Sequence, residues 1–197
     1  MTSLRAYATA PDTDLISWSA GGDRRAFDEI VVRHGHFALR AASRVIGNRA
    51  VAEEIAQEAM LRAWSQARHF DPDRARFTTW LYRIIMNLCI DQQRRVQPAP
   101  IPEDFNPVDP AATAPELVEA RERNTLLAGA ITELPASQRA ALTLVYDEGL
   151  SGAEAARVLG LSAKAVERLL ARARAHLRGR MERGLGLDGR LKESRRC

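Results

Sequence analysis

The chain has 197 residues, 46% of them hydrophobic and only 6% aromatic, which suffices for one ordinary domain or two small ones. No apolar run is long enough to cross a bilayer, the N-terminus lacks a signal-peptide pattern, and the two cysteines make no disulfide framework. The composition therefore argues against an integral membrane protein or a disulfide-stabilised secreted domain, and we expect a cytoplasmic protein without membrane insertion.

The net charge of +4 is distributed unevenly along the chain. Residues 96–150 carry 3 Lys and Arg against 9 Asp and Glu, whereas residues 151–197 carry 12 against 5. A basic end behind an acidic middle favours contact with a polyanion such as nucleic acid. A basic surface that meets only solvent would give the same count.

Residues 12–95 have helical periodicity and predict four helices. Asp12 or Thr13 is a candidate N-cap for the first helix and Asp23 for the second. The third is expected over about 50–67, with a buried stripe formed by Val51, Ile55, Ala59 and Ala63. A fourth follows the Asp71-Pro72 turn, and its apolar residues are spaced as one helix face: Phe77, Trp80, Leu81, Ile84, Ile85 and Leu88.

Prolines mark a boundary in the middle of the chain. Six of the nine lie between Pro98 and Pro115, in a stretch with neither helical nor strand period. We interpret residues 96–115 as a flexible linker, which at about 3.3 Å per residue reaches up to roughly 65 Å. The Gly- and Arg-rich segment 181–197 predicts a disordered tail.

Residues 116–180 also predict helices. One is expected from Leu117 to Ile131, and another with Ser137 as its N-cap. Ser151 and Glu154 have the spacing of a capping box, and Gly160 is a candidate left-handed C-cap. Ser162 can cap the last helix, whose apolar stripe is Val166, Leu169, Leu170, Ala173 and Leu177. The predicted fold class is therefore all-α, with two small helical domains joined by a proline-rich linker.

The last two predicted helices form a helix-turn-helix around Gly160. The face opposite the apolar stripe, taken with the cap, carries the candidate DNA-binding residues Ser162, Lys164, Glu167, Arg168, Arg172 and Arg174. Such a helix fits a major groove, where Arg reaches guanine edges and Lys or Arg binds phosphate. A plain helical hairpin with a solvated basic face is the alternative.

Two further helix faces suggest contacts. The fourth helix carries Arg83, Asn87, Asp91 and Arg94 opposite its apolar stripe, with Arg76 near its start, a pattern that suits single-stranded DNA. Its aromatics Phe77, Trp80 and Tyr82 are nevertheless better explained as core. The third helix presents Glu54, Gln57, Glu58 and Leu61, which suits protein docking, although, taken alone, a solvated face is the better explanation.

Three segments together resemble the extracytoplasmic-function group of sigma-70-like factors. They are AEEIAQEAMLRAW, FDPDRARFTTWLYRIIMNLCIDQQRR and, after the linker, LPASQRAALTLVYDEGLSGAEAARVLGLSAKAVERLLARARAHLR. The resemblance implies that the first segment docks on the clamp helices of core RNA polymerase through the Glu54, Gln57, Glu58 and Leu61 face. It implies that the second melts and reads the −10 element and that the third reads the −35 element of promoter DNA.

The resemblance further implies a non-enzymatic initiation factor, acting in a stress or envelope response, with an anti-sigma partner. One departure concerns Ala163-Lys-Ala-Val-Glu167, where many members carry a Thr-Val-Lys-Ser-like run, so the preferred −35 sequence stays open.

Other classes of protein fit the sequence less well. A sigma-like decoy that sequesters an anti-sigma factor is the main alternative, but such decoys usually carry a receiver domain as well. A plain helix-turn-helix repressor leaves residues 50–95 unexplained. The sequence shows no P-loop, no nucleophile constellation and no zinc-ligand spacing, so we expect neither catalytic residues nor a cofactor. His34 and His36 stand two apart on a predicted helix, so they face apart and predict no metal site.

Overall fold

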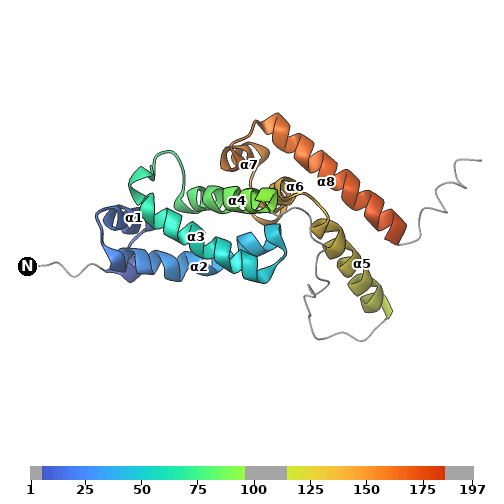
Figure 1. Cartoon of the computed structure of the whole chain (residues 1–197), viewed down its shortest axis with the longest axis horizontal. Coiled ribbons are helices and arrows are strands. Elements are labelled where there is room, and N and C mark those ends of the chain that lie inside the picture. Colours follow the sequence, from blue (N-terminus) through green and yellow to red (C-terminus); the bar gives the residue numbers. More distant parts are fainter. Residues whose placement is uncertain (1–5, 96–114, 185–197) are drawn as a thin grey trace, which may run out of the picture.

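The chain is all-helical in a computed structural model that describes residues 6–95 and 115–184, with side chains placed for 6–95 and 121–184 (Figure 1). The N-terminal bundle comprises α1 (Asp12–Ala20), α2 (Arg24–Ile46), α3 (Arg49–Ser65) and α4 (Phe77–Arg95). The C-terminal bundle comprises α5 (Pro115–Thr132), α6 (Ala136–Leu142), α7 (Gly152–Leu159) and α8 (Ala163–Gly184). Within these ranges there is no strand, which confirms the predicted fold class.

Short turns connect these helices. Two 3₁₀ turns, Tyr7–Thr9 and Ala67–His69, lie in the N-terminal bundle, and a π-helical turn, Thr143–Asp147, follows α6. Helix α7 spans Gly152–Leu159 and is separated from α8 by the turn at Gly160. The predicted linker spans residues 96–115. Residues 96–114 lie outside the described part of the chain, and Pro115 already begins α5.

Local capping starts some of the helices where the sequence indicates. The Asp23 carboxylate accepts from the backbone N–H groups of Arg25 and Ala26, which confirms it as the N-cap of α2. Neither Asp12 nor Thr13 caps α1, so that prediction is wrong: Pro11 occupies the N-cap position. The Asp12 carboxylate instead contacts α2, at 3.1 Å from an Arg33 nitrogen and 2.8 Å from His34 Nε2. A tertiary contact has thus taken the side chain that local pattern assigned to a cap.

The C-terminal bundle shows the predicted capping box and turn. The Ser151 hydroxyl accepts from the Glu154 N–H, and the Glu154 carboxylate accepts from the Ser151 N–H at 2.9 Å. Gly160 ends α7 in the left-handed conformation, at φ +65°. Ser137 does not cap α6, because Pro135 stands at the N-cap and the helix has already begun at Ala136.

The last helix is longer than its apolar stripe predicts. Helix α8 continues to Gly184, so the disordered tail predicted from residue 181 is wrong for residues 181–184, and residues 185–197 lie outside the described part. Helix α5 packs along α8, and a Cβ built on Gly184 would lie 3.0 Å from the methyl carbons of Leu126. This tertiary support extends the helix beyond the last residue that the pattern could place.

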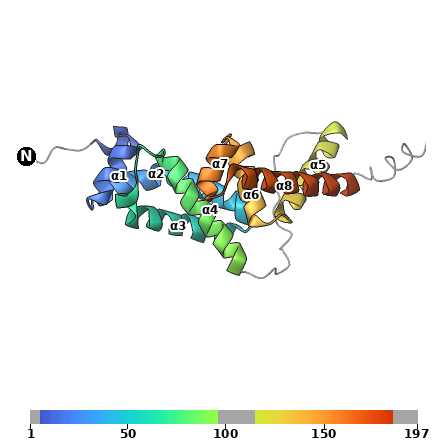
Figure 2. The ribbon, with the colours of Figure 1, turned by 90° about the horizontal axis from the view of Figure 1, so that it is seen from above.

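The two bundles are in contact with each other. Helix α4 packs against α6 and α7, and α2 packs against α6. Figures 1 and 2 both place α6 and α7 beside α4, with α5 and the end of α8 on the far side from α1. Buried residues of both bundles form one continuous hydrophobic cluster, so the C-terminal bundle is held directly on the N-terminal one.

Candidate nucleic-acid and polymerase interfaces

The helix-turn-helix presents a basic face on α8. The Ser162 hydroxyl accepts from the Ala165 N–H at 3.2 Å, which confirms Ser162 as a cap at the start of α8. Three residues of its apolar stripe, Val166, Leu170 and Ala173, are buried in the bundle. The opposite side is exposed to solvent at Ser162, Lys164, Glu167, Arg168 and Arg172. The structure therefore brings five of the six candidate −35 residues onto one open surface.

Arg174 lies apart from that surface. Its Nε donates to the Leu170 carbonyl at 3.3 Å, and its side chain lines a cavity beside Leu177 and Arg139. Part of the side chain is exposed, but it faces the groove between α8 and the rest of the protein. Helical spacing alone did not separate it from Arg168 and Arg172.

The polar face of α4 is also open. Arg83, Asn87 and Asp91 are exposed at successive turns, and Arg94 lies next to Asp91 with a nitrogen–oxygen distance of 3.8 Å. Arg76 is exposed just before the helix begins. Hydrogen bonds from Ser151 lower the pKa of the Glu154 carboxyl below its usual value, and the charges of Arg157 and Arg76 lower it further. Arg76 therefore lies on the side of α4 near α7, the helix that carries Glu154.

The burial of the α4 aromatic residues differs from what the apolar stripe predicts. Phe77 and Tyr82 are 3% and 4% exposed, which confirms them as core. Trp80 is half-buried and packs against Phe70, with ring centroids 5.4 Å apart. The apolar stripe thus includes one ring that stays partly open to solvent, while Tyr82, which lies off the stripe, is covered.

The acidic face of α3 remains uncovered. Glu54 and Gln57 are exposed, and Leu61 keeps 63% of its surface open to solvent. Glu58 is half-buried because its carboxylate pairs with Arg62 one turn later, at 2.7 Å. Among the described residues, Leu61 is one of few large apolar side chains that are exposed, and polar residues surround it on α3.

A second buried face of α4 was missed by sequence reasoning, apart from Tyr82, which was expected in the core. Tyr82, Met86 and Cys89 are all buried, although none belongs to the predicted stripe. Their spacing of i, i+4 and i+7 is itself helical and could have signalled a second covered face. Tyr82 packs on Phe37 of α2, with ring centroids 4.5 Å apart, and also lies near Glu148. Cys89 lies near Arg139 of α6, a neighbour that the sequence pattern alone does not place.

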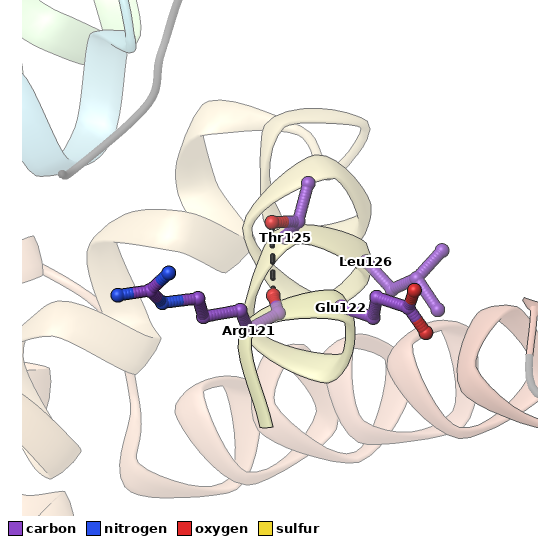
Figure 3. A pocket seen from close by; sticks show the side chains of 4 residues that line it. All are labelled: Arg121, Glu122, Thr125 and Leu126. Carbon is purple, nitrogen blue, oxygen red and sulfur yellow. Dashed lines mark hydrogen bonds between the residues drawn. The ribbon is translucent and has the colours of Figure 1, made fainter. Parts of the chain in front are cut away.

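Figure 3 shows a shallow hollow of the surface on α5, where the Thr125 hydroxyl donates to the Arg121 carbonyl at 2.9 Å and Arg121 points away from Glu122 and Leu126. In the described ranges no cluster of His, Cys, Asp and Glu could hold a metal ion. His34 contacts Asp12, and His36 contacts Arg40. Nor does any helix within residues 6–95 or 115–184 have the length and apolarity to span a bilayer.

Comparison with known families matches both bundles. Residues 30–98 match the family model of sigma-70 region 2, and residues 125–177 match that of sigma-70 region 4. The extracytoplasmic-function sigma factor SigM of Mycobacterium tuberculosis is 36% identical over 168 residues, covering 84% of this chain and 82% of SigM. The chain belongs to the extracytoplasmic-function group of sigma-70 factors. It is thus a promoter-specificity factor of RNA polymerase, of the kind that directs transcription initiation.

Further relatives of this sigma factor agree. CnrH of Cupriavidus metallidurans is 36% identical over 177 residues, covering 84% of this chain and 92% of CnrH. The solved structure of CnrH in complex with the cytosolic domain of CnrY matches with a TM-score of 0.58 and 32% identity, over 85% of this chain and 95% of that one. Sigma factors of this family are non-catalytic initiation factors, and the open helix faces described above are where their contacts must be sought.

Proposed function

We propose that three separate helix faces divide the work of initiation. The α3 face of Glu54, Gln57, Glu58 and Leu61 docks on core polymerase, the α4 face reads and melts the −10 element, and the α8 face reads the −35 element. Residues 12–95 and 116–180 are then the two functional domains, and residues 96–115 are the tether between them. The observation that carries this proposal is that each face is open while the opposite side of its helix is buried.

Docking through α3 follows from its exposed apolar residue. Leu61 stands in a polar surrounding, and burying such a side chain against a partner gains roughly 1.5–3 kcal/mol. Glu54 adds a negative charge that favours a basic partner surface and specifies orientation. Reversing Glu54 and Glu58 to Lys should weaken binding to core polymerase and leave the fold intact, because neither side chain is in the core.

The α4 face suits a strand that has left the duplex. Arg76, Arg83 and Arg94 supply charges for phosphates, and Asn87 supplies an amide that can hydrogen-bond a base. Asp91 lies 3.8 Å from an Arg94 nitrogen on the same exposed face. The half-open Trp80 ring offers a stacking surface near the same helix, whereas Phe77 and Tyr82 are covered and do not.

The α8 face suits the major groove. Lys164, Arg168 and Arg172 stand one turn apart on its exposed side, and Ala171 between them is small enough to allow close approach. Arg168 is central, so we assign it to a base edge, and we assign Arg172 to a phosphate. Arg174, which borders the cavity beside Arg139, is left out of this face. Glu167 flanks Arg168 and can accept from a cytosine amino group.

Run-off transcription with purified core polymerase tests the proposal. Core enzyme with the full chain should produce promoter-dependent transcripts, and core enzyme alone should not. The Glu54→Lys/Glu58→Lys variant should lose transcript and core binding together, while Arg24→Glu, a charge reversal on exposed α2, is the matched control. Core binding without transcripts from any promoter in a randomised library would instead indicate a decoy, and promoter binding without core would indicate a repressor.

An anti-sigma factor is the regulatory partner that we infer. CnrH, a relative of this chain, was solved as a complex with the cytosolic domain of CnrY. The corresponding partner of this chain would hold it in the cytoplasm until a stress or envelope signal releases it. The measurement that checks this inference is transcription in the presence of a purified candidate partner and again after its removal. Transcription should be lost and then recover, whereas an unrelated acidic protein should cause no loss and hence no recovery. We further propose that the chain has no catalytic activity of its own.

A further inference from the structure

A cavity lies between four helices and a turn of the chain. Its volume is about 460 Å³, within the range of about 300–1,000 Å³ that small-molecule pockets occupy. Helices α2, α5, α6 and α8 and the π-helical turn after α6 all supply parts of its wall. The lining residues are separate from those that we assign to polymerase or to promoter DNA, so the cavity calls for an explanation of its own.

Most of the cavity wall is apolar. Helix α5 contributes Leu127 and Ile131, and Leu142 and Leu177 come from α6 and α8. Leu127 keeps 38% of its surface exposed and Tyr146 keeps 58%, so no described part of the chain covers this wall. An apolar body placed along it would be removed from water together with these side chains, which is favourable.

One part of the wall carries a buried cation. Arg139 of α6 is 4% exposed, and one of its terminal nitrogens donates to the Thr132 carbonyl at 2.6 Å. Both residues line the cavity, which places the guanidinium at its wall. Arg139 Nε is one of two buried side-chain polar atoms that lack a hydrogen-bond partner among the described residues. The guanidinium therefore has donor capacity that the described chain does not use.

The charge of Arg139 also lacks a counter-charge. Asp147 lines the same cavity, but its carboxylate pairs with Arg44 at 3.5 Å, and Arg139 forms no ion pair within residues 6–95 or 121–184. Burial lowers the pKa of Arg139, because the charged form has lost hydration that no carboxylate replaces. Arg174 adds a second guanidinium to the wall. A buried charge without a partner is costly, so this site favours an anion.

The shape of the charge distribution selects the kind of anion. A carboxylate matches the fork of one guanidinium and can accept from two of its N–H groups at once. A phosphate dianion would have to exchange its hydration for a wall that is largely apolar, which is unfavourable. A single carboxylate on an apolar body satisfies both the cation and the apolar wall.

We propose that this cavity is a ligand site for a small apolar monocarboxylate, whose carboxylate pairs with Arg139 and whose carbon chain lies along the apolar wall of α5 and α8. Arg174 contributes a second positive charge near the carboxylate. The ligand would contact several helices of the folded chain and none of the unfolded chain, so its binding stabilises the fold by mass action. The proposal does not depend on the assignment of α3, α4 and α8 to polymerase and DNA.

Octanoate tests the charge and the carbon chain separately. Calorimetric titration of the purified full chain with sodium octanoate should give one saturable site. Neutral octanol should bind at least about tenfold more weakly, because it leaves the buried cation unpaired. Affinity should rise by about fourfold for each CH₂ from hexanoate to octanoate. Absence of saturable octanoate binding, or octanol binding as tight as octanoate, would overturn the proposal.

Two pairs of variants locate the site. Arg139→Met removes the cation and should weaken octanoate at least about tenfold while leaving octanol within about twofold. Its control is Arg178→Gln, which removes an exposed charge outside the cavity and should leave both affinities within about twofold. Ala128→Leu fills the cavity from α5 and should weaken both ligands, whereas Ala175→Leu, on exposed α8, should weaken neither.

The two changes in the cavity are independent of each other. If Arg139→Met fails to fold by circular dichroism, Ala128→Leu and its control still decide whether octanoate occupies the cavity. Octanoate affinity unchanged by Ala128→Leu would show that it binds elsewhere and would overturn the proposal. Loss of binding in Ala128→Leu with full binding in folded Arg139→Met would refute the pairing of the carboxylate with Arg139.

Discussion

Gly160, at the turn of the helix-turn-helix, offers a substitution whose cost can be assigned to one cause. Its φ is +65°, a left-handed conformation, and a Cβ built there meets no atom within 4 Å. Gly160→Ala therefore introduces backbone strain without a clash, at about 1–2 kcal/mol. Because the hydrophobic cluster runs through both bundles, we treat unfolding as one transition, for which each kcal/mol shifts Tm by about 2–4 °C. The expected loss is about 2–8 °C.

Two further variants isolate the cause of that loss. Gly160→Asn should lose clearly less than Gly160→Ala, because Asn tolerates the left-handed conformation. Gly152→Ala is the matched control: Gly152 opens α7, also with no atom near a built Cβ, but without a positive φ, so it should gain about 0.4–1 kcal/mol. Calorimetry gives the Tm values, and anisotropy with a −35 duplex well below Tm should show affinities within about twofold. A Gly160→Ala protein that melts with the parent would refute the reasoning.

Two other predictions concern DNA reading and pH. Losing a bidentate guanine contact costs about 1–3 kcal/mol at one base, so Arg168→Ala should change the −35 bases selected from a randomised library, whereas Arg172→Ala should weaken all sequences alike and lower the salt slope by about 0.9. Identical base preferences for Arg168→Ala and parent would show that Arg168 is not in the groove. Burial raises the pKa of the Cys89 thiol from 9.0 to about 12. The unfolded chain therefore ionises this thiol first, so stability falls as pH rises from about 9 toward 12, by up to about 1.4 kcal/mol per pH unit. Urea midpoints of Cys89→Ala between pH 8 and 11 should fall less steeply than those of the parent, and parallel curves would contradict this.

Elements that depend on neighbours within one turn were predictable from the sequence. The capping box of Ser151 and Glu154, the caps at Asp23 and Ser162, and the left-handed turn at Gly160 are all as the pattern indicates. Each is a contact between residues two to four apart, so its geometry follows once the helix forms. The buried and open faces of α3, and those of α8 apart from Arg174, were predictable for the same reason, since helical periodicity sorts them.

Elements that depend on distant residues were not predictable. The Asp12 carboxylate binds Arg33 and His34 on α2, more than twenty residues away, and so is not available as a cap. Arg174 has the spacing of a DNA-facing residue, yet it borders the cavity beside Arg139, which comes from α6. In both cases the sequence pattern assigns the side chain a local role. The side chain instead contacts residues that only the packing of the helices brings near.

The sequence by itself determined where most helices lie, the caps at Asp23, Ser151 and Ser162, and the main apolar face of each helix, because those follow from periodicity and contacts within a turn. Only the tertiary structure decided what covers each apolar face. Tyr82, Met86 and Cys89 require burial, and the hydrophobic effect rewards burial against any apolar surface in proportion to area. It carries no directional information that names the partner. That α4 also packs on α6 and α7 of the same chain depends on shape and on the few polar contacts at Gln93 and Arg44, which form only when the two bundles meet.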